Sequence, residues 1–406
     1  MLSAASRPYI DASIPVLREH GTAITTRFYA DMFAARPELT RLFNMGNQAN
    51  GSQQQSLASG LFAYAANIDN PDALAPVIDR IVHKHVAVGL TPAHYPIVGK
   101  YLIGAIKIVL GDAATPELIA AWDEAYWLLA GAFIAAESRL YDRSGMAAGQ
   151  LLPVRVVARE EQSETVASLT LASPDGKPLR DFAPGQYISV EATFPDGHRQ
   201  LRQYSLSAER GLPTWRISVK REVGDINTPE GAVSNWLHDT VQVGATLYVS
   251  TPWGEFTPEI DDRAPIVLLS AGIGITPMLS VLRTLAVEQP HRPVLFAHAA
   301  RHGGHHAHRD DLGWARERLS KLRTHISYEA PNDADQAGRD YDHAGTMPIR
   351  ALLDDRDSTH FKDARFYLCG PLGFMQAQRH ALISAGVPVQ NIHREVFGPD
   401  LLDDLL

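Results

Sequence analysis

Three short strings in the second half of the chain combine charged, aromatic, hydroxyl and glycine residues in patterns that could do chemistry. They are Arg202-Gln203-Tyr204-Ser205, Gly272-Ile273-Gly274-Ile275-Thr276-Pro277 and Cys369-Gly370-Pro371. Arginine supplies a fixed positive fork for phosphate, and tyrosine supplies a flat surface for a stacked ring. Closely spaced glycines let a diphosphate approach the backbone at a helix N-terminus. Together these residue types indicate a cradle for a flavin and a pyridine nucleotide, and hence hydride transfer.

Both glycine-bearing strings stand where a predicted strand gives way to a helix. The apolar stretch 266–270 predicts a buried strand, and a helix is expected from about 277 to 287, capped by Thr276. A second buried strand, 365–369, should bring Cys369 to the same carboxyl edge of a parallel sheet, where ligands bind in such folds. Taken singly, each turn is equally well explained as a structural one, and Cys369 as a small buried residue.

The hydrophobic pattern divides the 406 residues into three units. In residues 1–146 apolar side chains recur at three- and four-residue spacings, which predicts an all-α domain. Residues 152–260 alternate and are rich in β-branched side chains, which predicts an antiparallel β-barrel. Residues 261–406 alternate buried strands with helices, which predicts an α/β domain with a parallel sheet. Small residues at 144–150 are typical of a linker.

Composition narrows the setting in which this chain works. A net charge of −9 and a pI near 6.0 argue against nucleic acid or an anionic membrane as a partner. Cys369 is the single cysteine, so no intrachain disulfide can form, and a cytoplasmic location is expected. The first residues lack the pattern of a signal peptide. The longest apolar run, 127–136, is about half a membrane span, so it is expected in a buried helix and no stable membrane insertion is predicted.

The order of the three strings resembles the ferredoxin–NADP reductase family over residues 152–406. The resemblance implies that the first string binds FAD, the second a nicotinamide dinucleotide, and the third lies near the nicotinamide. It also implies an aromatic contact to FAD from Tyr187, and Phe397 over the flavin ring. Ser234, just before a helix-like run, is expected to cap a second phosphate. The C-terminal string of this cradle is Glu395-Val396-Phe397-Gly398-Pro399.

The helical unit offers two histidines, His83 and His85, which cannot face the same way on one helix. Spacing alone leaves open whether either binds a metal. The stretches 41–53 and 84–99 resemble the globin domain of bacterial flavohaemoglobins, and with the reductase-like module behind them the resemblance covers essentially the whole chain. It implies that His85 is the ligand of a haem b iron, whose opposite position stays open for O₂.

The same resemblance assigns roles around the haem. Tyr95 and Glu137 would form a charge relay with His85, and Lys84 would reach a haem propionate or tune its potential. From the residues alone, a core tyrosine is the preferred interpretation of Tyr29. A solvated residue is the alternative for Glu137, although the apolar run 127–136 just before it indicates a largely buried helix. The side chains that the resemblance places on or against the distal face of the haem are Tyr29, Phe43, Gln53 and Leu57.

The function implied is that of a nitric oxide dioxygenase, with NO and O₂ as substrates and NADH or NADPH as the electron donor. Two alternatives stay open: an oxygen-binding or oxygen-sensing globin with its own reductase, and an NAD(P)H-dependent lipid-peroxide or flavin reductase. The apolar distal pocket around Leu57 could admit a lipid or an azole, and a monomer is expected. Arg301 could meet a 2′-phosphate, but the sequence leaves NADH against NADPH open.

A histidine-rich string, Arg301-His-Gly-Gly-His-His-Ala-His308, would suit zinc or nickel. No acidic or cysteine partner completes a ligand set for it. A solvated loop near the adenosine end of the nucleotide is therefore the favoured interpretation. The chain also departs from the flavohaemoglobin pattern at the linker, which lacks Gly-Gly-Trp, and at the loop 225–231.

Overall fold

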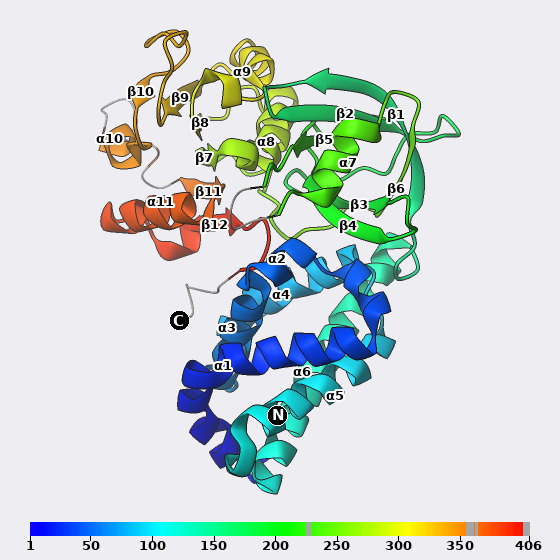
Figure 1. Cartoon of the computed structure of the whole chain (residues 1–406). Helices are drawn as coiled ribbons and strands as arrows, with labels where there is room; N and C mark the ends of the chain where they lie inside the picture. Colours follow the sequence, from blue (N-terminus) through cyan, green and yellow to red (C-terminus); the bar gives the residue numbers. More distant parts are fainter. Residues whose placement is uncertain (225–228, 355–360, 362–363, 401–406) are drawn as a thin grey trace.

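The computed structural model of the chain describes residues 1–224, 229–354, 361 and 364–400. It contains three units in sequence order (Figure 1): a helical unit, an antiparallel sheet and a parallel sheet. The helical unit lies below the two sheets in this view, and the chain's C-terminal segment runs back to it from the parallel sheet. The predicted fold class is thereby confirmed.

Prolines and capping side chains set the starts of several helices in the first unit. Asn70 accepts a hydrogen bond from Ala73 N, and Thr115 accepts one from Leu118 N, each just before a proline in the first helical turn. A glycine in the left-handed conformation, Gly145, ends the last helix. The elements of this unit are α1 (Arg7–Ala35), η1 (Pro37–Leu42), α2 (Met45–Ala49), α3 (Ser52–Ala66), α4 (Pro71–Ala87), η2 (Pro92–His94), α5 (Tyr95–Leu110), η3 (Gly111–Ala113) and α6 (Pro116–Ser144).

Helix α6 is the one helix of the described chain that is long and apolar enough to cross a membrane. It packs against α1, α4 and α5 and buries Trp122 and Phe133, which is the position of a core helix in a globin. The predicted burial of the run 127–136 is wrong at Trp127 and Leu128, which are exposed. Only one face of a helix can turn toward the core, so a continuous apolar run leaves some of its members outside.

The second unit is a six-stranded antiparallel sheet in the order β4-β3-β6-β1-β2-β5. An isolated bridge between Leu206 and Ile217 joins the two edge strands, so the sheet closes on itself as a barrel. Its interior is filled by buried side chains such as Trp215 and Ile188. The elements are β1 (Leu152–Glu161), β2 (Val166–Ala172), β3 (Tyr187–Thr193), β4 (Arg199–Ser205), β5 (Trp215–Lys220), α7 (Ala232–Thr240) and β6 (Thr246–Val249).

The third unit is a six-stranded parallel sheet in the order β10-β9-β8-β7-β11-β12, with helices on its faces. Strand β7 is buried along its whole length, as expected of a central parallel strand. Its elements are β7 (Ile266–Ala271), η4 (Gly272–Gly274), α8 (Ile275–Glu288), β8 (Val294–Ala300), η5 (Gly303–His305), α9 (Arg309–Arg316), β9 (Leu322–Tyr328), β10 (His343–Ala344), α10 (Ile349–Asp354), β11 (Arg365–Cys369), α11 (Leu372–Ser384), η7 (Val389–Asn391) and β12 (Ile392–Glu395).

The linker between the first two units packs onto the end of α4. The backbones of Gly89 and Gly149 are in contact. A Cβ on Gly89 would lie 2.4 Å from the Cα of Gly149, so position 89 requires glycine. Arg180 of the barrel donates to the carbonyls of Arg143 and Ser144. The junction is therefore held by direct contacts.

Candidate functional site

His85 belongs to a partly buried hydrogen-bonded cluster that links α4, α5 and α6. Its Nδ1 lies 2.7 Å from Oε1 of Glu137, and the Tyr95 hydroxyl donates to the same oxygen at 2.5 Å. Because Nδ1–H donates a hydrogen bond to the carboxylate, the lone pair of His85 is on Nε2 and available to a metal. Burial and the Glu137 charge together raise the pKa of Tyr95 well above its usual value, so it stays a donor.

These three side chains fit a haem whose iron is held by Nε2. A carboxylate that binds the far nitrogen of a ligating imidazole fixes the ring's orientation and makes it a stronger electron donor. Phe133 lies edge-on to the His85 ring at 5.5 Å and holds it from the side. Glu137 is 2% exposed, and its Oε2 has no hydrogen-bond partner among the described residues. A buried carboxylate of this kind is expected where a cationic centre lies nearby.

Tyr29 lies on α1 in the core of the helical unit, and the side-chain amides of Gln53 and Gln48 lie near its hydroxyl. Burial raises the pKa of Tyr29 well above its usual value, so the hydroxyl remains protonated. The side-chain amide nitrogen of Gln48 is buried without an acceptor among the described residues. The Tyr29 hydroxyl and the Gln48 amide thus form a small polar group within otherwise apolar packing, and this group can orient a small polar ligand.

Phe43 and Leu57 border the same core and remain partly buried. The Phe43 ring lies edge-on to Tyr29 at 5.8 Å, which ties the chain after η1 to the tyrosine on α1. Leu57 and Gln53 are one turn apart on α3, so they share a face. The structure thus brings together the distal residues named from the sequence.

Arg202 on β4 has the surroundings of a phosphate-binding residue. Its guanidinium donates to Gln200 Oε1, to the carbonyl of Leu201 and to Asn44 Oδ1, all neutral acceptors. No carboxylate of the described chain lies within ion-pairing distance, and burial lowers the pKa of Arg202. A partly buried cation without an anion fits a diphosphate better than a purely structural role. Sequence reasoning did not foresee Asn44, which comes from the helical unit.

The neighbours of Arg202 differ in exposure. Tyr204 is partly buried against the barrel core, Ser205 is buried, and Gln203 is exposed. Tyr187 is 5% exposed and packs with Val86, Ala87 and Trp253 at the contact with the helical unit. Contact of Tyr187 with a flavin stays a prediction.

Ser234 lies inside the first turn of α7 and not ahead of it. Its hydroxyl donates to the Gly231 carbonyl and accepts from Glu222 N, so the expected cap before the helix is wrong in position. Gly231, the residue just before α7, is the N-cap residue instead. Of the loop 225–231, residues 225–228 lie outside the described part of the chain.

The C-terminal string 395–399 joins the reductase-like units to the helical unit. Lys84, the neighbour of His85, donates to the carbonyls of Gly398 at 2.8 Å and Val396 at 3.4 Å. Its ammonium group therefore lies on this segment, a contact that sequence reasoning did not foresee. Phe397 is 45% exposed, which suits an aromatic ring that a flat cofactor would cover. Gly398 has a φ of 104°, and Pro399 follows it.

The two glycine turns meet at the carboxyl edge of the parallel sheet, as predicted from their strands. Ser270 of β7 is paired with Cys369 of β11. A Cβ on Gly274 would lie 2.3 Å from the Cys369 carbonyl oxygen, so only glycine permits this approach. Gly272 has a φ of 53° and Gly370 a φ of 159°. The remaining members of the turns are Ile273, Ile275, Pro277 and Pro371.

Two details of these turns differ from expectation. Helix α8 begins at Ile275, and the Thr276 hydroxyl donates to the Ile273 carbonyl, so Thr276 is not the cap. Cys369 is fully buried, and burial raises the pKa of its thiol, which fits a packing role. The N-terminal end of α8 still offers backbone N–H groups toward the edge where a diphosphate would bind.

Several contacts that join the units gave no signal in the sequence. Arg80 of α4 pairs with Glu255 of the barrel unit at 3.1 Å and also with Asp400. His83 accepts a hydrogen bond from Gly254 N at 3.0 Å. The partners are 171 to 320 residues apart along the chain, beyond the reach of spacing arguments. They hold the His85 helix against the segment that carries Phe397.

Glu395 provides a test of how this buried junction responds to pH. Burial and the Glu255 charge raise its pKa from 4.5 to about 8, with Lys84 opposing. The folded state thus holds the proton more tightly than the unfolded state, so the stabilisation is complete below about pH 4.5 and is lost as the pH rises through 8. The thermal midpoint of the holoprotein should fall over this window, and Glu395→Gln should flatten the profile. The exposed substitution Glu329→Gln should leave the profile unchanged; an identical slope in Glu395→Gln would contradict the assignment.

Comparison with known proteins matches all three units to described families. A Globin family model matches residues 26–133, an Oxidoreductase FAD-binding domain model matches 153–257, and an Oxidoreductase NAD-binding domain model matches 268–380. The chain is similar to a flavohemoprotein of Rhizobium meliloti, with 45% identity over 99% of both chains. It is also similar to the flavohemoprotein of Bacillus subtilis, with 40% identity over 99% of this chain and 98% of that one.

Solved structures give the same result for the whole chain and for its second part. A flavohemoglobin from Malassezia yamatoensis with bound FAD and heme has a TM-score of 0.83 and 32% identity, covering 98% of this chain and 100% of that one. The FAD/NAD binding domain of a nitric oxide dioxygenase from Vibrio cholerae has a TM-score of 0.54 and 34% identity, covering 61% of this chain and 99% of that one. The three-unit order, the residues that fit haem, flavin and nucleotide, and full-length identity of 45% together show that the chain belongs to the flavohaemoglobin (flavohemoprotein) family.

Proposed function

We propose that the chain is an NAD(P)H-dependent nitric oxide dioxygenase that binds haem b and FAD. The observation that carries this proposal is Lys84, which donates to the 396–398 segment while the adjacent His85 stands in the cluster that fits a haem iron. Neighbouring positions of α4 would thus serve the haem site and the segment that carries Phe397. The relative from Vibrio cholerae, called a nitric oxide dioxygenase, supports the assignment.

The overall reaction balances with one nicotinamide for two turnovers. A hydride from NAD(P)H carries two electrons to the flavin, and each conversion of NO and O₂ to nitrate consumes one electron. FAD, when bound, would supply the exchange between a two-electron hydride and single electrons, and a haem held by His85 would supply a binding site for O₂. We infer that Arg202, Ser234 and the 272–277 turn bind the phosphates that anchor these cofactors.

The chain's own side chains set the properties of the haem site. Glu137 and Tyr95 hold His85 in one orientation and keep its Nε2 basic, which strengthens electron donation from the proximal side. Tyr29 and Gln53 supply polar groups on the distal side, with Phe43 and Leu57 excluding water. We further propose that the chain is a cytoplasmic monomer.

Tyr29→Phe tests the distal assignment. If the hydroxyl donates to bound O₂, its removal should speed O₂ dissociation from the reduced protein by roughly tenfold, the scale of one lost hydrogen bond. The rate is measured by flash photolysis or stopped-flow mixing. Tyr64→Phe is the matched control, because its hydroxyl donates to the Ala125 carbonyl within the same unit. An unchanged rate in Tyr29→Phe would remove Tyr29 from the pocket.

The proposed activity is tested with purified holoprotein, NADH or NADPH, and an NO electrode. NO consumption should require both O₂ and the nicotinamide, and should yield nitrate as the product. Slow NADH oxidation and stable O₂ binding without NO consumption would instead indicate an oxygen-binding globin. Faster reduction of a lipid hydroperoxide than of NO would indicate the peroxide reductase. Comparing NADH with NADPH in the same assay decides the donor.

A further inference from the structure

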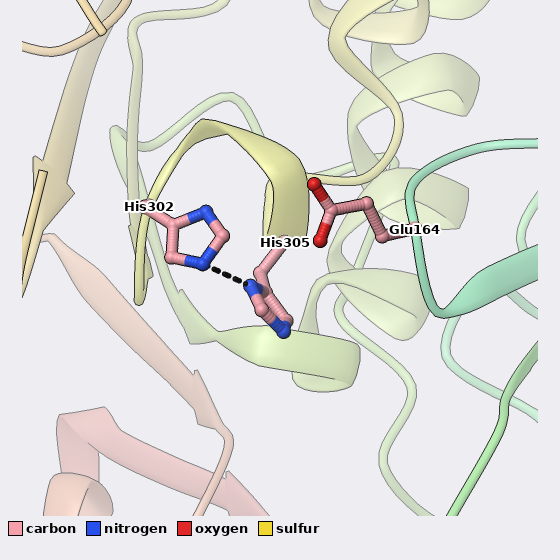
Figure 2. Close-up of side chains that lie close together, drawn as sticks. All are labelled: Glu164, His302 and His305. Carbon is pink, nitrogen blue, oxygen red and sulfur yellow. Dashed lines mark hydrogen bonds between the residues drawn. The ribbon is translucent and has the colours of Figure 1, made fainter. Parts of the chain in front are cut away.

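Two loops from different units meet at the edge of the reductase-like part, far from the haem cluster in sequence. The turn after β1 carries Glu164, and the turn after β8 carries His302 and His305 (Figure 2). Glu164 N donates to the Gly304 carbonyl at 3.0 Å, so the two turns are fixed to each other through the backbone. The fold thus supplies the acidic partner that the histidine-rich string lacks in the sequence.

The two imidazoles are arranged with nitrogen facing nitrogen. His302 Nε2 and His305 Nδ1 are 2.9 Å apart, and the rings are nearly perpendicular at 80°. Two nitrogens on one tetrahedral zinc ion lie about 3.3 Å apart, given Zn–N bonds of about 2.0–2.1 Å. A small outward movement of either ring therefore makes room for an ion in place of the shared proton.

The remaining nitrogens can adjust when the ion replaces that proton. His302 Nδ1, which now accepts from Gly304 N, would become a donor in place of that bond. Asn332 Nδ2 lies 3.4 Å from it, and a flip of this amide would present the Asn332 oxygen as the acceptor. His305 Nδ1 already faces His302 Nε2 across the gap that the ion would occupy. Both rings can therefore present lone pairs to the same point.

Glu164 completes the group from the other unit. Its ligand oxygen and the two imidazole nitrogens all lie within 4.8 Å of one another. The carboxylate has no hydrogen-bond or ion-pair partner within the described part of the chain. A Cβ on Gly304 would lie 2.1 Å from Glu164 Oε1, so the glycine between the histidines is what lets the carboxylate approach.

We propose that Glu164, His302 and His305 bind one divalent transition-metal ion of the zinc class, with water completing the coordination. Two imidazoles and a carboxylate are a donor set that suits Zn²⁺. The ion bridges the FAD-binding and NAD-binding units, so its effect is to tie the second sheet to the barrel. It is separate from the haem iron and does not depend on the proposed reaction.

The test is a zinc titration of chelator-treated holoprotein against a competing chromophoric chelator. We expect one Zn²⁺ per chain and a rise in the thermal midpoint with zinc, because binding to the folded state stabilises it. His302→Ala, His305→Ala and Glu164→Gln should each weaken zinc affinity by more than tenfold, the lower end of what loss of even an indirect partner costs. His291→Ala and Glu329→Gln, exposed residues of the same unit as the histidines, are the matched controls.

Folding of each variant is checked by its FAD content and by NADH-dependent dye reduction, which should match the unmodified protein. Zinc-edge X-ray absorption of the loaded protein should show imidazole nitrogens and oxygen at about 2.0–2.1 Å. Gly304→Ala should lose zinc affinity with both histidines in place, because its side chain displaces the Glu164 carboxylate. Absence of stoichiometric binding, or unchanged affinity in any of the three ligand variants, overturns the proposal.

Discussion

His85→Ala should abolish haem binding and NO turnover while NADH-dependent dye reduction through FAD survives. The imidazole is the one group of the Glu137–Tyr95 cluster whose free nitrogen, Nε2, can hold an iron, and alanine leaves the buried carboxylate without its partner. The dye reaction depends on the barrel and the parallel sheet, where the flavin and nucleotide residues lie. Haem content is read from the Soret band, and both activities are measured on the same preparation.

His83→Ala is the matched control, two residues away on the same helix. His83 accepts from Gly254 N and faces the barrel, so its loss should leave haem content unchanged and slow flavin-to-haem transfer through a looser junction. If His83→Ala lost the haem and His85→Ala kept it, the ligand assignment would be wrong. Loss of dye reduction in His85→Ala would show that the helical unit is needed for the reductase part to fold.

Gly274→Ala should suppress every NADH-dependent activity, both dye reduction and NO turnover, by on the order of a hundredfold. The added Cβ would lie 2.3 Å from the Cys369 carbonyl oxygen, and no side-chain rotation can relieve contact with a backbone atom. The turn before α8 must then shift away from β11, and the nucleotide loses its position relative to the flavin. Steady-state dye reduction with varied NADH measures the loss, and haem and FAD content should be retained.

Gly313→Ala provides the control for Gly274→Ala, because a Cβ there meets no atom within 4 Å and it lies on α9 of the same unit. Its activities should match those of the unmodified protein. Full dye reduction in Gly274→Ala would show that the edge formed by 272–277 and 369–371 does not receive the nucleotide. Loss in both variants would point to a general instability of the parallel sheet.

His85 and Gly274 lie at the two ends of the proposed electron path, the haem end and the nucleotide end. His85→Ala removes the acceptor end and should leave the donor end working, whereas Gly274→Ala removes the donor end and should leave the haem in place. Lys84 joins the two ends, since it lies next to His85 on α4 and contacts the 396–398 segment. If each variant loses only its own function, the haem site and the nucleotide site are separable within one chain.

The sequence by itself determined the order of the three units, and it named most of the residues that the candidate sites bring together. Helical spacing, strand alternation and glycine turns are local patterns, and each depends on residues within a few positions of one another. The meeting of Ser270 with Cys369 could be inferred because parallel strands share one edge. The choice of His85 over His83 came from family resemblance, since spacing alone could not decide it.

Only the tertiary structure decided which distant side chains meet. It placed Asn44 on Arg202, His83 on Gly254 and Glu164 beside His302, contacts between units that the sequence separates by more than a hundred residues. It also showed that Ser234 lies inside the first turn of α7 and not ahead of it, because local backbone hydrogen bonds fix where a helix starts. Chain periodicity reports which face of an element is buried, but packing geometry decides what that face touches. For that reason the cluster of Glu164, His302 and His305 and the junction around Lys84 became visible only in three dimensions.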